Sequence, residues 1–334
     1  MNRQTTLALL LVAAAAVVAA APFLGREPVP LAALWQAADD PMQTAILWRI
    51  RIPRAAIGFL AGAALALSGA TFQAMFRNPL AEPYTLGVSS GAALGAALAI
   101  FFEQQIARAD LLGAWRFSAV SLAAFAGAVL VMALIYGLGR ARRGFSTPTM
   151  LLAGVAVSFF CSSLILLVQY LSDFTQTFRM LRWVMGGLES VVAVGDVFNL
   201  LPFTVAGAMI LFALSRELNL LVTGEDLAAS RGVELHRTKL ALFLTASLMV
   251  GAVVALCGPI GFVGLMAPHI CRLLIGPDHR WLLPASLLFG GAFLVACDAL
   301  ARTALYPTEL PVGIITALLG GPFFLWLLWG RGRE

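Results

Sequence analysis

Long apolar runs recur along most of this chain, and they constrain its fold more than any other feature of the sequence. They lie at about residues 7–24, 55–76, 86–102, 117–138, 149–170, 197–214, 240–257, 281–299 and 311–329. A helix needs roughly 20 apolar residues to cross the hydrocarbon of a bilayer. Only 12% of the 334 residues are charged, against about a quarter in soluble domains. We therefore expect the lipid bilayer to be the solvent for most of the chain.

A tenth apolar segment is shorter than the other nine. It runs from Pro259 to Pro268 (PIGFVGLMAP) and is bounded by prolines. At about 1.5 Å per residue it cannot cross a bilayer alone, so it must be a broken or re-entrant helix packed inside protein. The sequence thus predicts an all-α, polytopic membrane protein with about ten transmembrane helices, one of them short and broken. We expect a single transmembrane domain over residues 1–334.

Arginine-rich segments set the expected orientation. The short loop 139–144 (GRARRG) holds three arginines, and the chain ends in WGRGRE with two more. Positive charge beside a span marks the cytoplasmic side, so we place both segments there, and ten spans then put both termini in the cytoplasm. The first apolar run also has the pattern of a signal peptide, one early positive charge and an alanine-rich end, so its retention stays open.

One basic cluster opposes this orientation rule. The stretch Trp48–Arg54 (WRIRIPR) carries three arginines, and the ten-span topology places it on the outer side. Arginines there can extend to lipid headgroups, which is our interpretation of Arg49. Pro53 is placed to mark the first turn of the span that follows. Arg302 follows Asp298 at the i, i+4 spacing of a helical ion pair.

The longest polar segment, Ser215–Lys239, is expected in the cytoplasm. Thr223 is suited to cap a short helix with Glu225 and Asp226 in its first turn, where the helix dipole favours anions. Gly232 is placed to end that helix in a left-handed conformation. Such a unit is either a solvated connector or a rigid knob that seats in a groove of another protein.

Several classes of function lack the residues that they need. The sequence has no GxxxxGK[ST], and no glycine-rich loop precedes Lys239, the single lysine. Neither GxSxG nor HExxH occurs, and the basic residues do not gather on one polar face as nucleic-acid binding requires. The four cysteines lie in or beside apolar runs without a CxxC pair, and the three histidines are scattered. We expect buried thiols, and neither an enzyme, nor nucleic-acid binding, nor a metal site.

The order of several motifs resembles a known family. The region Arg51–Gly95 is followed by STPTMLLAGVAVS, RWVMGGL, GEDLAASRGV, GPIGFVGLMAPHICRLLIGPDHRWLLPAS and DALARTALYPTELPVGIITALLGGPFFLWLL. Together these cover nearly the whole chain and are similar to the permease subunits of type II ABC importers, which take up ferric siderophores, haem and cobalamin. The resemblance implies a multi-pass subunit of the bacterial inner membrane. It would move a metal chelate, first an iron–siderophore complex and next haem or cobalamin, from periplasm to cytoplasm by alternating access.

The resemblance also implies partners. A second permease, as a homodimer or a related chain, would complete the pathway, and a periplasmic substrate-binding protein would deliver the ligand. Two ATP-binding cassette subunits would hold ATP and magnesium, so no cofactor is expected in this chain. The alternative is a secondary transporter driven by an ion gradient, which needs ionisable residues near the middle of its spans. Glu103, Asp298 and Glu309 instead fall toward the outer ends.

Carried over residue by residue, the resemblance assigns four groups of sites. Arg51, Arg54 and Arg302 match the rim charges that dock the binding protein, where guanidinium groups meet carboxylates. The group that couples to the ATPase comprises Gly224, Glu225, Asp226, Ala228, Ala229, Arg231 and Gly232.

The other two groups concern the pathway. The cytoplasmic gate comprises Asn78, Leu80, Thr147 and Pro148, and the last of these stands where the family often has a second hydroxyl. Arg179 and Arg182 lie near the outer entrance of the substrate pathway. They would either face an anionic ligand or anchor the interface beside Trp183.

Overall fold

The computed structural model describes residues 2–25, 41–82, 87–103, 118–141, 147–189, 194–305 and 308–331, and these ranges contain helices but no strands. The elements are α1 (Arg3–Ala20), the 3₁₀ turn η1 (Ala21–Phe23), α2 (Pro41–Ile46), the π-helical turn η3 (Leu47–Arg51), α3 (Ile52–Met75), α4 (Val88–Phe101), α6 (Ala119–Ala141), α7 (Thr147–Leu171), α8 (Phe174–Val184), α9 (Val194–Ala213), α10 (Ser215–Thr223), α11 (Glu225–Ser230), α12 (Leu235–Cys257), α13 (Val263–Ile275), α14 (His279–Thr303) and α15 (Val312–Arg331).

Among the described residues, 7 helices are long and apolar enough to cross a membrane. They are α1 with η1, the continuous helix from α2 to α3, α6, α7, α9, α12 and α14. The apolar helices α4, α13 and α15 are shorter. The all-helical class is therefore confirmed, while the number of helices that cross the bilayer stays a prediction.

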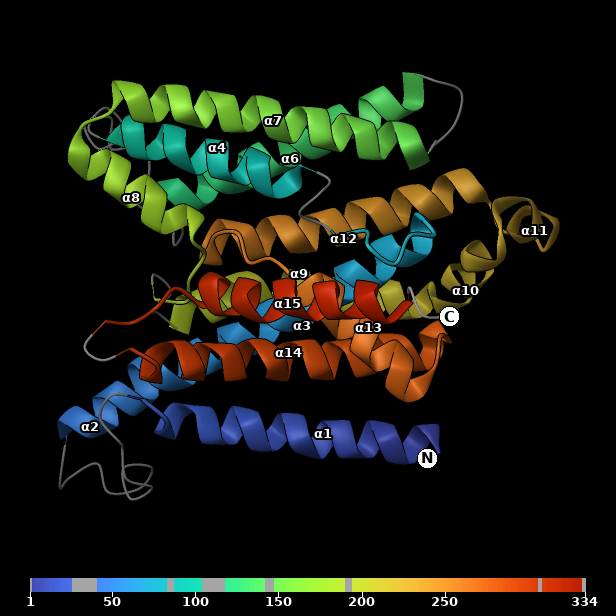
Figure 1. Ribbon diagram of the computed structural model, residues 1–334, viewed down its shortest axis with the longest axis horizontal. Coiled ribbons are helices and arrows are strands. Elements are labelled where there is room, and N and C mark those ends of the chain that lie inside the picture. The colour runs from blue at the N-terminus through green and yellow to red at the C-terminus, as the bar shows by residue number, and fades with distance from the viewer. Residues whose placement is uncertain are drawn as a thin grey trace.

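The long helices differ in how deeply they lie in the bundle. In their most apolar stretches 83% of the residues in the α2–α3 helix, 72% in α12 and 61% in α14 are buried, against 22–28% in α1, α6, α7 and α9. In Figure 1, α1 and α7 lie at opposite edges of the bundle. The first residues of α1 and the last turn of α15 lie at the same end as α10 and α11, which agrees with termini on one side.

Small residues bring the central helices into backbone contact. A Cβ atom added at Gly62 of α3 would overlap the carbonyl oxygen of Gly290 on α14, and one added at Gly95 of α4 would overlap that of Ala123 on α6. Each of these glycines closes a GxxxG pair, Gly58–Gly62 or Gly91–Gly95, a spacing that lets membrane helices approach closely.

The short broken segment is present, but its helix is displaced along the chain. Residues 258–262 are not helical, and α13 then runs through Pro268 to Ile275 instead of ending at the proline. Pro268 has no N–H, so the carbonyl of Gly264 loses its helical donor. Gln73 on α3 places its Nε2 atom 3.4 Å from this carbonyl and 3.4 Å from that of Leu265. This side chain allows the helix to continue past the proline.

The basic cluster Trp48–Arg54 lies within a helix and not at its start. We predicted that Pro53 marks the first turn of a span, but the helix begins at Pro41 and passes through the proline. Without an N–H, Pro53 cannot bond to the carbonyl of Arg49. The chain widens into a π-helical turn, in which the N–H of Ile52 bonds to the carbonyl of Leu47, five residues back.

The contact between α3 and α14 can be tested with a matched pair of substitutions. Gly62→Ala should lower the thermal unfolding midpoint of the purified protein, because the new methyl group would press on the backbone of Gly290. Overpacking costs about 1–3 kcal/mol, more than the roughly 1 kcal/mol that alanine gains over glycine in a helix. Gly137→Ala on α6, where an added Cβ meets nothing within 4 Å, is the control. Equal midpoints for the two variants would contradict the contact.

Candidate functional site

The helix α11 forms a short capped unit outside the bundle (Figure 1). Its N-cap is Gly224, with a φ of 133°. We predicted that Thr223 would cap this helix, and this was wrong: its hydroxyl donates instead to the carbonyl of Leu220 at 2.7 Å. Glycine holds the cap position because other residues rarely adopt this backbone conformation.

The other end of α11 closes as predicted. Gly232 has a φ of 85°, and its N–H bonds to the carbonyl of Ala229 at 3.0 Å, while the N–H of Val233 bonds to that of Ala228 at 3.1 Å. This pair of bonds satisfies carbonyls that a helix end leaves free. Ala228 is buried. The exposed residues of this unit are Asp226, Leu227, Ala229, Ser230, Arg231 and Gly232. The unit is therefore a short helix capped at both ends, which we call the knob.

Glu225 connects this knob to two long helices. Its Oε2 lies 2.6 Å from Nζ of Lys239 on α12, and its Oε1 lies 4.0 Å from Nη2 of Arg77, which follows α3. The Lys239 side chain is only 4% exposed. An ammonium group at that depth needs a counterion, because an unpaired buried charge is costly. The ion pair therefore holds the first turn of α11 against the bundle.

The predicted gate loop follows directly on Arg77. The side chain of Asn78 turns back on its own loop, where its Oδ1 accepts from the N–H of Leu80 at 3.0 Å. The carbonyl of Asn78 accepts from the N–H of Ala81 at 3.0 Å. Leu80 is exposed. The side chains of Thr147 and Pro148, the other predicted half of the gate, lie outside the described residues, so the pairing of the two halves stays a prediction.

Glu82, at the far end of the same loop, was not among the site residues predicted from the sequence. Its Oε1 accepts from the N–H of Phe262 at 2.6 Å. Phe262 is the N-cap of α13, where free N–H groups and the helix dipole favour a carboxylate. The gate loop is thus held at both ends, by Glu225 at Arg77 and by α13 at Glu82. The feature of the sequence that could have identified Glu82 is its position as a carboxylate within the otherwise apolar stretch after Asn78.

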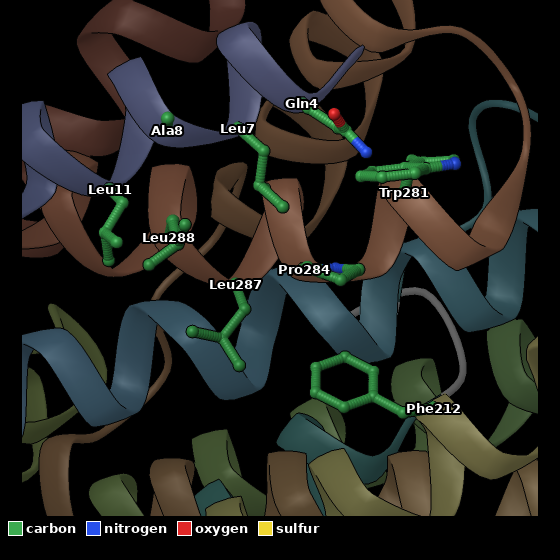
Figure 2. Close-up of a pocket in the computed structure, with 9 residues that line it drawn as sticks. All are labelled: Gln4, Leu7, Ala8, Leu11, Phe212, Trp281, Pro284, Leu287 and Leu288. Atoms are coloured by element: carbon green, nitrogen blue, oxygen red, sulfur yellow. The ribbon is translucent and has the colours of Figure 1, made fainter.

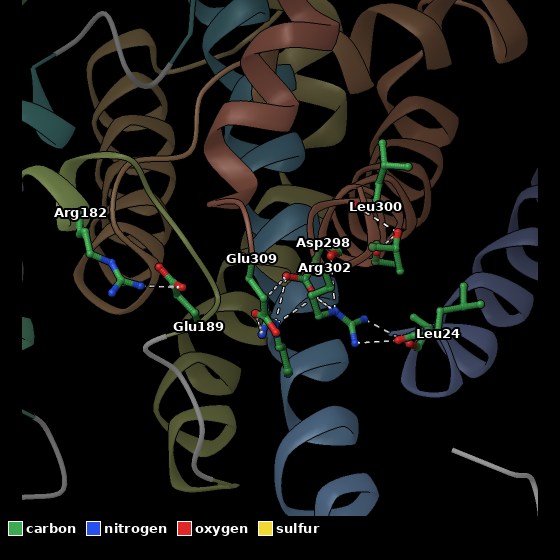
Figure 3. A network of polar contacts seen from close by, with 11 residues as sticks. Leu24, Arg182, Glu189, Asp298, Leu300, Arg302 and Glu309 are labelled. Atoms are coloured by element: carbon green, nitrogen blue, oxygen red, sulfur yellow. Dashed lines mark hydrogen bonds and ion pairs between the residues drawn. The ribbon is translucent and has the colours of Figure 1, made fainter. Parts of the chain in front are cut away.

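A second polar cluster lies at the end of the bundle opposite α11 (Figure 1), and Figure 3 shows it from close by. Arg54 donates from Nε and Nη2 to the carboxylate of Asp298 at 2.9–3.1 Å and from Nη1 to Glu309 at 2.9 Å. Arg302 places its Nε 3.1 Å from Oδ2 of Asp298, so the predicted i, i+4 pair is confirmed. The Asp298 side chain is 3% exposed. Two guanidinium groups therefore share one buried carboxylate, and removal of one partner from such a buried cluster typically costs about 3–5 kcal/mol because it leaves a buried charge unpaired.

The same end holds the last turn of α1. Arg51 donates from Nη1 to the carbonyl of Pro22 at 3.1 Å, and Arg302 donates to those of Leu24 and Ala21 at 2.9 and 3.1 Å. Cations suit a helix C-terminus, because its last carbonyls have no partner within the helix.

The structure therefore brings Arg51, Arg54 and Arg302 together at one end, as the docking hypothesis requires. It does not leave them as open rim charges, because all three are largely buried and hydrogen-bonded. Sequence spacing gave no sign of the link between Arg54 and Asp298, which lie 244 residues apart. Docking itself stays a prediction.

The two arginines assigned to the pathway entrance both have carboxylate partners. Arg179 on α8 donates to Glu103 by two hydrogen bonds, which lower the pKa of that carboxyl. Arg182 pairs with Glu189 at 2.9 Å. Both arginine side chains are about half exposed, and such pairs are worth only about 0–1 kcal/mol. An incoming anion can therefore compete with either carboxylate, and the role in the pathway stays a prediction.

Within the described ranges, the cysteines and the other residues that could bind a metal do not form a further functional site. Cys161, Cys257, Cys271 and Cys297 are buried and free, as predicted. No group of three or more His, Cys, Asp or Glu residues within these ranges is placed to hold a metal ion.

The apolar bundle, with its long apolar helices, is that of a multi-pass membrane protein. The sequence matches the model of the FecCD transport family over residues 9–330, and the chain belongs to this family. The resemblance to permeases of type II ABC importers is thereby confirmed.

Individual relatives agree with this assignment. The chain is 45% identical to the cobalamin import system permease of Halobacterium salinarum, over 86% of this chain and 74% of the relative. It is 39% identical to the hemin transport system permease of Yersinia pestis, over 90% of this chain and 88% of that one. A solved ABC transporter, described as metal-chelate type and inward-facing, has a TM-score of 0.85 at 30% identity and covers 98% of this chain and 99% of its own.

Proposed function

We propose that this chain is the transmembrane subunit of an ATP-driven importer that carries a metal chelate from periplasm to cytoplasm by alternating access. The observation that carries the proposal is the match over nearly the whole chain to the FecCD family and to a metal-chelate-type transporter. An iron–siderophore complex is the first candidate substrate. Haem and cobalamin stand beside it, because two similar permeases are named for these ligands.

In this proposal α11 seats on an ATP-binding cassette subunit at the cytoplasmic face of the inner membrane. Two such subunits would bind ATP and magnesium, and closure of their dimer would move the exposed knob as a rigid body. Glu225 would pass this movement to Lys239 and Arg77 through the two ion pairs. Because Arg77 adjoins Asn78, the gate loop would move with α11.

The remaining partners complete the pathway. A second permease, identical or related, would face this one across the translocation route. A periplasmic substrate-binding protein would dock at the end that holds Arg51, Arg54 and Arg302. For Arg54 to meet an acidic residue of that protein, the incoming carboxylate would replace Glu309, the more exposed of its two partners.

A secondary transporter driven by an ion gradient is not supported. Two of the buried charges, Lys239 and Asp298, lie near the ends of α12 and α14, and each is engaged in an ion pair. Such pairs do not offer the titratable site at mid-depth that ion coupling needs.

Reconstitution tests the proposed function. Proteoliposomes that contain this chain, its cassette subunit and its binding protein should accumulate one of three labelled ligands: a ferric siderophore, hemin or cyanocobalamin. Uptake should require ATP and stop when the hydrolytic residues of the cassette are substituted. Uptake that follows a proton or sodium gradient with the inactive cassette would contradict the proposal.

The link from knob to gate predicts a specific defect. Glu225→Gln should lower uptake by roughly 2- to 100-fold while the cassette still binds, since coupled contacts are worth about 0.5–3 kcal/mol. Arg77→Gln keeps the Glu225–Lys239 pair and should lower uptake by up to about fivefold without loss of stability, because a partly exposed pair is worth about 0–1 kcal/mol. Glu234→Gln, in an exposed pair with Arg237, is the control. Equal uptake by Arg77→Gln and Glu234→Gln would contradict the link.

Docking can be tested in two directions. Glu309→Gln removes a competitor for Arg54 and should tighten binding of the substrate-binding protein by up to about fivefold, the worth of a partly exposed pair. The control Glu189→Gln releases Arg182 instead and should change nothing.

Charge reversal of Arg51, Arg54 and Arg302 together should abolish docking, and retained assembly with the cassette would show that the variant is folded. Docking that is undiminished in this triple variant, or unchanged in Glu309→Gln, would remove these arginines from the docking site.

A further inference from the structure

A groove of about 430 Å³ lies between α1, α14 and the last turn of α9 (Figure 2). Its lining consists of Gln4, Leu7, Ala8, Leu11, Phe212, Trp281, Pro284, Leu287 and Leu288. Figure 2 places the amide of Gln4 beside the indole of Trp281 at one end, with the apolar side chains beyond them. The groove is therefore largely apolar, with the amide of Gln4 at its mouth.

The groove opens toward the surroundings of the bundle. Leu11 is 56% and Phe212 is 37% exposed, and α1 is among the least buried of the long helices. Its volume lies at the lower end of the roughly 300–1,000 Å³ of small-molecule sites. An apolar space of this size at the edge of the bundle suits a single acyl chain better than a bulky metal chelate.

Two exposed arginines lie near the mouth. Arg3 and Arg280 both act electrostatically on Asp278, the N-cap of α14 three residues before Trp281. The nearby carboxylate of Asp278 lies 3.6 Å from Nη1 of Arg3. It stays ionised, because hydrogen bonds from Asn219 and the N–H of Arg280 lower its pKa despite partial burial. Two arginines against one carboxylate leave one excess cation, which attracts anionic headgroups.

We infer that this groove binds an anionic phospholipid, with one acyl chain in the apolar body and the phosphate at Arg3 and Arg280. An indole at the mouth fits this arrangement, since tryptophan favours the boundary between headgroups and hydrocarbon. The groove lies at the end of the bundle that carries α11, so under the proposed orientation the lipid belongs to the cytoplasmic leaflet.

Quenching of tryptophan fluorescence tests this site. The full-length protein in phosphatidylcholine nanodiscs receives a small mole fraction of brominated phosphatidylglycerol or of brominated phosphatidylcholine. The contribution of Trp281 is the difference between the protein and its Trp281→Phe variant. We expect the brominated anionic lipid to quench this contribution at roughly fivefold lower mole fraction, the effect of one excess cation. Both leaflets are alike in a nanodisc, so the result does not depend on orientation or transport.

Two variants locate the lipid. Arg3→Gln with Arg280→Gln leaves the carboxylate of Asp278 as the net charge and should abolish or reverse the preference for the anionic lipid, and Ala8→Phe should fill the groove and reduce quenching by both lipids. Ala156→Phe, on an exposed face of α7, is the control for added bulk. Equal quenching by the two lipids, or a preference that survives the double variant, would overturn the headgroup assignment. Undiminished quenching in Ala8→Phe, or none in any protein, would show that no acyl chain enters the groove.

Discussion

Hydrocarbon offers no hydrogen bonds, so this chain must satisfy every buried backbone group by itself, and the structure depends on how it does so. Continuous helices meet the demand without help, whereas interruptions need side chains. Gln73 serves the carbonyls beside Pro268, and Glu82 serves the N–H of Phe262 where α13 begins. At Pro53 the helix itself widens by one residue. These three irregularities are therefore each paired with a specific remedy, and two of the remedies come from α3 or the loop that follows it.

The same helix links the two ends of the molecule. At one end Arg54 binds the buried carboxylate of Asp298 on α14. At the other end Arg77 reaches Glu225 on the knob. Between them, backbone contact at Gly62 leaves little room for α3 to slide against α14. Interiors this closely packed transmit displacement instead of absorbing it, so a push on α11 would reach the gate loop and the centre of the bundle together.

The class of fold followed from the sequence because apolar length depends on local composition alone. The short broken helix could be predicted for the same reason. Its bounds could not, because the helix continues past Pro268 with a hydrogen-bond donor from Gln73, which is far away in the sequence. The sequence left open whether the segment around α11 is a connector or a knob. Gly232 was correctly expected to end this helix, yet Thr223 was chosen over Gly224 for its start, because composition does not reveal φ. The pairing of Arg54 with Asp298 has no local pattern at all. It arises only when α3 and α14 meet.

The burial of Lys239 has a practical consequence for biochemical work on the assembled transporter. No other lysine exists in the chain, and this one is shielded and neutralised by Glu225. Amine-reactive cross-linkers and labels will therefore find almost no side-chain target on the permease and will report chiefly on its soluble partners. Any labelling of Lys239 would mark molecules in which α11 has moved away from α12. The chain thus contains its own chemical reporter for that movement.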